Sequence, residues 1–219
     1  MKLVIFDLDG TLAETLDDLL QALNRMLTEL SLPLCTREKL FTFVNNGIYR
    51  FIKLALPEHL QSDEELIQTA IRIYERHYAD CYADKTQPYE GLPEVLERLQ
   101  KNGILLAVLS NKQDAFVKNI IAKIYPDGLF KEVCGQLNLP AKPDPQSTLA
   151  IATRLGIAAS DCIYCGDSDV DMQTAKNAGM TALGVSWGYR TTDILYDAGA
   201  AYVAKDPEDL YRFIYSFSR

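Results

Sequence analysis

Two aspartates stand two positions apart at the end of the first apolar run of the chain. Residues 2–6 predict a buried strand, Asp7 and Asp9 follow it, and Gly10 allows a sharp turn directly afterwards. Because residues i and i+2 of an extended segment point to the same side, both carboxylates can face one pocket. The two carboxylates are therefore candidates for chemistry at a shared site.

A second group of acidic residues follows another apolar run, Cys162–Cys165. Asp167 and Asp171 would add two more carboxylates to the first pair, and so dense a group is unfavourable unless a cation lies among them. Oxygen ligands without His or Cys suit a hard ion, and Mg²⁺ is the best candidate. Asp169 is expected to cap the helix that follows.

Other side chains could bind an anion beside these carboxylates. Lys142, which precedes Pro143, can offset negative charge as a point cation. The hydroxyls of Ser110 or Thr11, together with backbone N–H groups of the turn after Asp7, can hold phosphate oxygens. These residues could therefore hold a phosphate group beside the carboxylates.

Apolar strands alternate with helical patterns from Gly91 onward. Besides the first strand, strands are predicted at 104–109, near 133–134, and at 162–165, 181–185 and 201–203. Helices are predicted at 93–101, 113–124, 145–155 and 170–178, with a short helix after 185 and a last helix from Pro207. This alternation predicts an α/β fold, a doubly wound parallel sheet covered by helices on both faces.

The predicted strands place the polar clusters at one edge of that sheet. The Asp7 segment follows the first strand, residues 110–112 follow the second, and residues 166–171 follow the strand at 162–165. Ligands of such sheets bind beyond the carboxyl ends of the strands. The three clusters are therefore expected to form one site.

The segment between the first two strands reads differently from the rest. Leu16, Leu19, Leu23, Met26 and Leu27 follow i, i+3, i+4 spacing, and further helical patterns continue to about residue 85, with an interruption at 45–47. We predict an all-helical insertion over 15–85 in a core domain of 1–14 and 86–219.

Composition narrows the possible classes of partner. The net charge is −8, with 22 Lys and Arg against 30 Asp and Glu, which disfavours nucleic-acid binding through a basic field. No apolar run has the length of a secretion signal or a membrane span, so we expect a cytoplasmic protein with no membrane contact. The five cysteines are scattered, and Cys162-Ile163-Tyr164-Cys165 is interpreted as strand core instead of a redox motif.

These motifs together resemble a known family. The chain is similar to haloacid dehalogenase-type hydrolases of the phosphoglycolate-phosphatase-like branch, which share four motifs in this order. Their counterparts here are Asp7-Leu8-Asp9-Gly10-Thr11-Leu12, Ser110-Asn111-Lys112, Lys142-Pro143 and Gly166-Asp167-Ser168-Asp169-Val170-Asp171-Met172. The helical insertion resembles the family's cap domain.

The resemblance implies a role for each matched residue. Asp7 would attack phosphorus and form an aspartyl-phosphate, with Asp9 as general acid and base and Lys142 neutralising the phosphate. The Asp7 carboxylate, the backbone carbonyl of Asp9 and Asp167 would bind Mg²⁺, supported by Asp171. The residues implied near the phosphate are Thr11, Ser110, Asn111 and Lys112.

The resemblance leaves the substrate open. A small phosphorylated metabolite is expected, with phosphoglycolate the leading candidate, and the cap residues Gly47 and Arg50 are candidate substrate contacts. A sugar-phosphate mutase similar to β-phosphoglucomutase, or an inorganic pyrophosphatase, would use the same Asp7 and Asp9. A non-catalytic binding protein has no need of Asp7, Asp9, Lys142 and Asp167 together. A dehalogenase is disfavoured because Asp9 and the metal-site acids suit phosphate. The protein is expected to be a monomer or a homodimer.

Overall fold

The computed structural model describes residues 2–44 and 47–217, and these divide into two compact units. The first contains Met1–Glu14 and Pro88–Arg219, and the second contains Thr15–Gln87. The sequence predicts the limits of the insertion at 15 and 85. The chain leaves the first unit and returns to it at β2 (Ala13–Glu14) and β3 (Gln87–Pro88), which form a two-stranded sheet.

The first unit is built on a parallel sheet of six strands within the described residues. Their order is β5-β4-β1-β6-β7-β8, and each strand runs parallel to its neighbours. The strands are β1 (Leu3–Phe6), β4 (Leu105–Gln113), β5 (Glu132–Gln136), β6 (Cys162–Gly166), β7 (Thr181–Val185) and β8 (Tyr202–Ala204). The predicted α/β class with a parallel sheet is confirmed.

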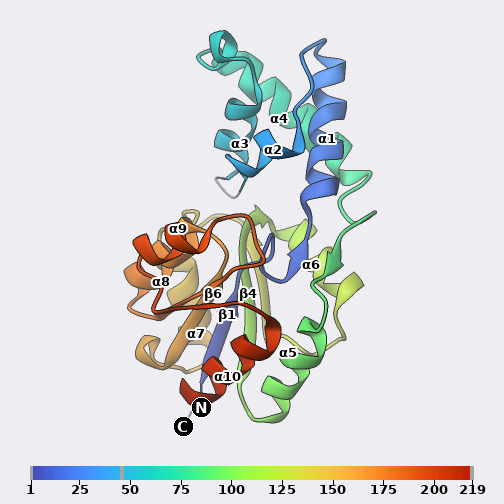
Figure 1. Cartoon of the computed structure of the whole chain (residues 1–219). Helices are drawn as coiled ribbons and strands as arrows, with labels where there is room; N and C mark the ends of the chain where they lie inside the picture. The colour runs from blue at the N-terminus through green and yellow to red at the C-terminus, as the bar shows by residue number, and fades with distance from the viewer. Residues whose placement is uncertain (1, 45–46, 218–219) are drawn as a thin grey trace. The chain divides into compact units, whose positions relative to one another are not determined.

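Helices cover both faces of this sheet, as Figure 1 shows. On one face α7 (Gln146–Arg154), α8 (Asp169–Ala178) and α9 (Thr192–Asp197) pack on a core that includes Ile5 and Tyr164. On the other face lie α5 (Leu92–Lys101), α6 (Asp114–Ile124) and α10 (Pro207–Phe217), and α5 contacts α10. A short 3₁₀ helix, Ala159–Asp161, precedes β6.

Burial explains the apolar runs of the strands. All four residues of β1 and all five of β6 are buried, because helices cover the sheet on both sides. Cys162 and Cys165 lie in β6 as buried free thiols, so the interpretation of this C-x-x-C as strand core is confirmed. Burial raises the pKa of the Cys165 thiol well above its ordinary value, which also makes it a poor nucleophile.

β4 is longer than the sequence predicts. It continues past Leu109 to Gln113, and its pairing with β5 shifts register between these two residues. A β-bulge of this kind lets a strand carry extra residues without breaking the sheet. The prediction that residues 110–112 follow the strand is therefore wrong in detail, since they form its bulged end.

The second unit is helical in its described residues. It contains α1 (Leu16–Glu29), α2 (Arg37–Phe41), α3 (Ile48–Ala55), the 3₁₀ helix Glu58–Leu60 and α4 (Glu64–Ala79). The predicted apolar stripe of α1 is buried, and α1 packs along α4. A chain of ring contacts links Phe51 of α3 to Tyr74 and Tyr78 of α4. No helix of residues 2–44 and 47–217 is both long and apolar enough to cross a membrane.

Candidate active site

Asp7 stands where the buried strand β1 ends. Its backbone N–H donates to the carbonyl of Cys165 at 2.9 Å, which continues the pairing of β1 with β6 by one residue. The side chain is almost fully buried, with 3% of the residue exposed. Because β1 lies between β4 and β6, the carboxyl ends of all three strands come together near Asp7.

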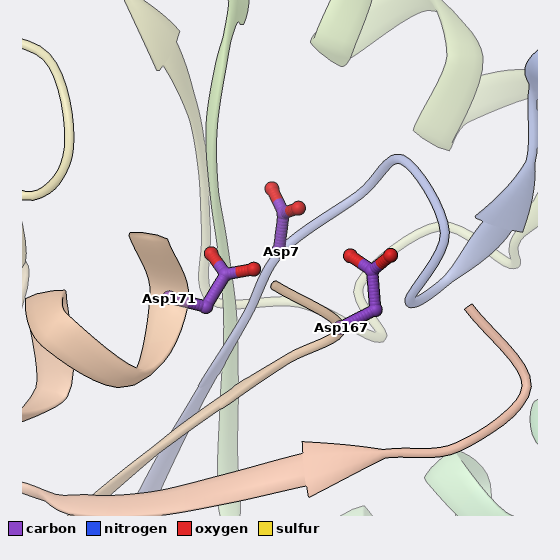
Figure 2. Close-up of side chains that lie close together, drawn as sticks. All are labelled: Asp7, Asp167 and Asp171. Carbon is purple, nitrogen blue, oxygen red and sulfur yellow. The ribbon is translucent and has the colours of Figure 1, made fainter. Parts of the chain in front are cut away.

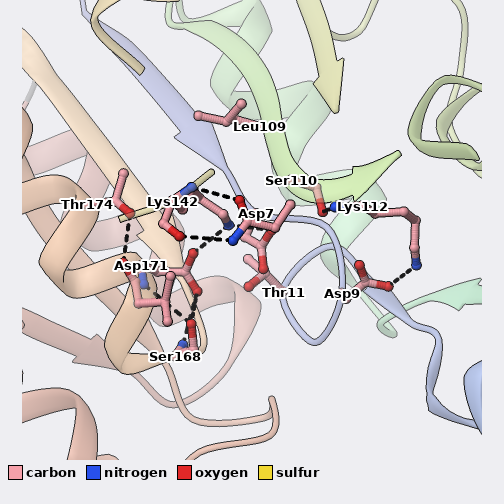
Figure 3. A network of polar contacts seen from close by, with 12 residues as sticks. Asp7, Asp9, Thr11, Leu109, Ser110, Lys112, Lys142, Ser168, Asp171 and Thr174 are labelled. Atoms are coloured by element: carbon pink, nitrogen blue, oxygen red, sulfur yellow. Dashed lines mark hydrogen bonds and ion pairs between the residues drawn. The ribbon is translucent and has the colours of Figure 1, made fainter. Parts of the chain in front are cut away.

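Lys142 reaches this point from the loop between β5 and α7. Its Nζ lies 2.8 Å from Asp7 Oδ1 and 2.7 Å from Asp171 Oδ1, so one ammonium bridges two carboxylates (Figure 3). Burial acts to lower the pKa of Lys142, but Asp171 and Asp7 more than offset it and hold the pKa well above its ordinary value. The side chain is therefore a fixed positive charge, as predicted for a residue that neutralises an anion.

Three aspartates form a buried carboxylate cluster. One oxygen each of Asp7, Asp167 and Asp171 lies within 4.8 Å of the others, and the three side chains come from three different segments (Figure 2). Burial raises the pKa of Asp7 to about 7 against the opposing effect of Lys142, and Asp171 and Asp9 raise it further. Burial, Asp171 and Asp7 raise the pKa of Asp167 well above its ordinary range.

The raised pKa values mark this cluster as a place for an additional cation. In its absence, two of the three carboxylates resist ionisation because burial and mutual repulsion disfavour their charged forms. The donors are oxygens only, which suits a hard divalent ion more than zinc or copper. The residues present therefore fit a metal site made from Asp7, Asp167 and Asp171.

Asp171 is held by the start of its own helix. The Ser168 hydroxyl and backbone N–H donate to Asp171 Oδ2 at 2.6 and 3.1 Å, and Ser168 Oγ accepts from the Asp171 N–H at 3.3 Å. This is a capping box, with Ser168 at the N-cap. The prediction that Asp169 caps the helix is wrong, because Asp169 lies inside it. The pattern Ser-x-x-Asp in the sequence could have identified Ser168.

A glycine leaves the space that Asp171 occupies. A Cβ on Gly166 would lie 2.3 Å from both the Cβ and the Cγ of Asp171, closer than real atoms approach. Only a residue without a side chain fits at the end of β6 while α8 starts immediately above it. Gly166 thus allows Asp171 to reach Lys142.

Asp9 lies in the turn that follows β1, two residues beyond Asp7. Its carboxylate pairs with the ammonium of Lys112, and both side chains are largely buried (Figure 3). The carboxylate of Asp9 is not one of the three that form the cluster. Its predicted contribution to a metal site is through its backbone carbonyl, and that role stays a prediction.

The bulged end of β4 supplies three more residues that the sequence singles out. Asn111 brackets the backbone of Lys142, since its Nδ2 donates to the Lys142 carbonyl at 3.1 Å and its Oδ1 accepts from the Lys142 N–H at 2.8 Å. Ser110 Oγ accepts from the Lys112 N–H at 3.2 Å. Two of the three thus position catalytic candidates, Asn111 through Lys142 and Lys112 through Asp9. Their predicted contacts with phosphate stay predictions.

Thr11 lies beside the cluster as well. It is 1% exposed, and its hydroxyl donates to Asp167 Oδ1 at 3.4 Å. The first unit therefore brings together every predicted site residue that belongs to it. Gly47 and Arg50 belong to the second unit, where Gly47 precedes α3 with a φ of +73° and Arg50 is exposed on α3. Their contact with substrate stays a prediction.

A comparison with known proteins identifies the family. The sequence profile of haloacid dehalogenase-like hydrolases matches residues 4–185, which contain the whole cluster. The chain belongs to this family.

Two curated relatives and one solved structure extend the comparison. A phosphoglycolate phosphatase of Pseudomonas savastanoi pv. phaseolicola is 34% identical over 94% of this chain and 76% of its own length. A phosphoglycolate phosphatase of Mannheimia succiniciproducens is 32% identical over 97% of this chain and 98% of its own. A crystal structure from Haemophilus somnus, described as a predicted phosphoglycolate phosphatase, is 27% identical, with a TM-score of 0.89 over 97% of each chain.

These relatives and the family agree on the type of enzyme. The chain is a phosphatase, a hydrolase of phosphoric monoesters. A metal site made from a buried aspartate cluster is compatible with this family.

Proposed function

We propose that this enzyme hydrolyses a small phosphate monoester with Mg²⁺ as cofactor and Asp7 as nucleophile. The observation that carries the proposal is the cluster itself. Three buried carboxylates lie within 4.8 Å of one another, and the bridging ammonium of Lys142 contacts two of them. A nucleophilic carboxylate, a fixed cation for the phosphate and a place for a metal ion thus coincide.

In the first half of the proposed reaction, an oxygen of Asp7 attacks phosphorus. The bond from phosphorus to the ester oxygen breaks, and Asp9 donates a proton to the departing oxygen to release an alcohol. Lys142 lies 2.8 Å from the Asp7 carboxylate, so its charge acts where the negative charge of the phosphoryl group gathers. The product of this half is an aspartyl-phosphate on Asp7.

In the second half, water hydrolyses the aspartyl-phosphate. Asp9, now without its proton, takes a proton from the attacking water, and inorganic phosphate leaves as Asp7 is regenerated. Thr11, Ser110, Asn111 and Lys112 are proposed to line the phosphate position, as the family motifs imply. Each bond that forms is matched by one that breaks, and Asp9 ends as it began, so the cycle needs no further reactant.

The carboxylates of Asp7 and Asp167 and the backbone carbonyl of Asp9 would hold Mg²⁺, with Asp171 in support. Bound there, the ion would neutralise the cluster and polarise a phosphate oxygen. Asp171 would act mainly through Lys142, which it contacts at 2.7 Å. The raised pKa of Asp167 agrees with a ligand that is built to be ionised only with its cation.

Phosphoglycolate is the leading candidate substrate. Support comes from the two curated phosphoglycolate phosphatases, each about a third identical over nearly all of this chain. The helical unit would act as the cap that selects the leaving group, with Gly47 and Arg50 as its proposed contacts. An arginine suits a substrate that carries a carboxylate beside its phosphate.

Phosphate release from a panel of small esters, with pyrophosphate and hexose phosphates included, tests this proposal. We expect Mg²⁺-dependent release, with phosphoglycolate giving the highest kcat/KM. Interconversion of hexose phosphates without phosphate release would instead assign a mutase, and preference for pyrophosphate would assign a pyrophosphatase. A high rate on another ester would keep the reaction and overturn only the substrate.

A further inference from the structure

A segment that none of the family motifs includes lies against the metal cluster. Residues 186–190 follow β7, which pairs with β6. They nevertheless contact both the turn after Asp7 and the carboxylate of Asp167. We call residues 187–190 the clamp segment, after the contacts described below.

The backbone of the clamp segment fixes the orientation of Asp167. The N–H of Tyr189 donates to Asp167 Oδ2 at 2.7 Å, while the Thr11 hydroxyl donates to Oδ1 at 3.4 Å. Asp167 is fully buried, so these hydrogen bonds replace those that its carboxylate would make with water. Asp167 is therefore oriented by two donors from segments far apart in the sequence.

The side chain of Trp187 ties the clamp segment to the turn after Asp7. Its indole N–H donates to the backbone carbonyl of Thr11 at 3.1 Å. The Thr11 hydroxyl donates to Asp167, so Thr11 forms hydrogen bonds with both Trp187 and Asp167. The Tyr89 ring lies beside the indole, with its centroid 6.2 Å away.

Two glycines show how closely these segments meet. A Cβ on Gly188 would lie 2.2 Å from the Cβ of Asp167 and 2.5 Å from the carbonyl oxygen of Gly10. A Cβ on Gly10, whose φ is +82°, would lie 2.4 Å from Asp167 Oδ2 and 2.9 Å from the Tyr189 ring. The backbone at Gly10 and at Gly188 thus packs directly against the Asp167 side chain.

The end of the clamp segment is tied to α8. Arg190 Nε lies 3.7 Å from Asp169 Oδ1, and the arginine side chain is 13% exposed. Asp169 is the first residue of the helix that carries Asp171. The segment therefore contacts each of the three places from which carboxylates enter the cluster.

From these contacts we infer that Trp187 is a positioning residue for the metal site. Its indole N–H holds Thr11, Thr11 and Tyr189 hold Asp167, and Asp167 is thereby presented to the cation in a fixed orientation. This inference depends on the proposed metal site but adds a residue outside the four motifs. Outer groups that orient metal ligands typically change metal affinity by roughly 10–100-fold when they are removed.

Calorimetric titration of the purified enzyme with Mg²⁺ tests the inference without measuring turnover. Trp187→Phe keeps an aromatic side chain of smaller size and removes the indole donor. Tyr202→Phe is the matched control, because it removes a hydroxyl that donates to Asp209 at 3.0 and 2.9 Å, in contacts between β8 and α10. We expect the Mg²⁺ dissociation constant to rise about tenfold in Trp187→Phe and to stay unchanged in Tyr202→Phe.

Kinetics separate a positioning role from a merely structural one. If Trp187 orients Asp167, the Mg²⁺ concentration needed for half-maximal activity rises in Trp187→Phe, while kcat at saturating Mg²⁺ recovers to within about threefold of the wild type. Equal Mg²⁺ affinity in wild type and Trp187→Phe would overturn the inference, even if Trp187→Phe unfolds at a lower temperature than the wild type. If the wild type itself binds no Mg²⁺, the proposed function fails first.

Gly188→Ala gives an independent test. Its added methyl would meet the Asp167 Cβ at 2.2 Å, so Asp167 or the clamp segment must move. We expect a larger loss of Mg²⁺ affinity than in Trp187→Phe, measured on protein whose circular dichroism matches the wild type. Unchanged Mg²⁺ affinity in folded Gly188→Ala would show that the clamp segment does not orient Asp167, and would also overturn the inference.

Discussion

Two buried carboxylate sites, one in each unit, differ in how their charge is balanced. In the second unit Asp18 is fully buried and accepts hydrogen bonds from the backbone of Lys85 and from both the backbone and the hydroxyl of Thr86. The distances are 2.7 to 3.1 Å. These donors satisfy the hydrogen-bonding capacity of the single Asp18 carboxylate without a bound cation.

The cluster in the first unit is built in the opposite way. Asp7, Asp167 and Asp171 lie within 4.8 Å of one another, and burial raises the pKa of the first two. Lys142 balances part of this charge through Asp7 and Asp171. Apolar or amide side chains at these positions would cost less free energy than three buried carboxylates. A cluster of this kind therefore points to a function other than stability. The difference is the one expected between a structural carboxylate and the proposed catalytic group.

Replacing one acid at each site gives the largest expected contrast. We expect Asp7→Asn to lower kcat by about 10³-fold or more, as removal of a nucleophile does, while the protein stays folded. Asp18→Asn should instead lower the free energy of unfolding by about 1–3 kcal/mol, because it replaces an acceptor oxygen with a donor beside two N–H groups, and should keep kcat within a fewfold. Phosphate-release kinetics and urea unfolding of both variants provide the measurement. Substantial Mg²⁺-dependent turnover in Asp7→Asn would sink the nucleophile assignment.

Metal removal should act on one of the two sites alone. We expect EDTA to abolish activity and added Mg²⁺ to restore it, with Ca²⁺ restoring little because it prefers longer bonds and more ligands. Mg²⁺ at a hundred times its dissociation constant should also stabilise the fold by about 2.7 kcal/mol. Asp18→Asn should show the same gain as the wild type, and Asp7→Asn a smaller one. Full activity of the wild type in EDTA is the result that would contradict the metal role.

The pH dependence of stability should sharpen the contrast in metal-free protein. The pKa of Asp7 is raised from 3.8 to about 7 in the folded state. Between these values the folded state keeps a proton that the unfolded chain has lost, so stability falls as pH rises through this range. For one group the slope is at most about 1.4 kcal/mol per pH unit. Above the folded pKa, the contribution of Asp7 to stability stops changing with pH.

Asp7→Asn removes this titration, so the variant isolates the contribution of Asp7 from those of all other groups. We expect metal-free Asp7→Asn to gain stability relative to the metal-free wild type as pH rises from 4 to 8, in denaturant unfolding with EDTA present. Asp18→Asn is the control. It keeps Asp7, so the titration of Asp7 should contribute nothing to the difference in stability between this variant and the wild type. A stability difference between Asp7→Asn and wild type that does not change with pH would contradict the raised pKa.

The sequence alone predicted the elements that carry the site. Apolar runs marked the strands, and Asp7 and Asp167 follow two of them, as predicted. Ser110 follows an apolar run in the sequence but lies in the bulged end of β4. The helical stripe of the insertion and the buried C-x-x-C followed from periodicity and composition in the same way. The metal-site and phosphate-site roles carried over from the family remain predictions.

What only the tertiary structure decided were contacts made by backbone groups or by residues distant in sequence. The Tyr189 N–H on Asp167, the Asn111 amide on the Lys142 backbone and the pairing of Lys112 with Asp9 are of this kind. Every residue except proline has a backbone N–H, so its type does not reveal which carboxylate it will meet. The distances within the Asp7 cluster, and with them the raised pKa values, likewise depend on how three strand ends meet in space.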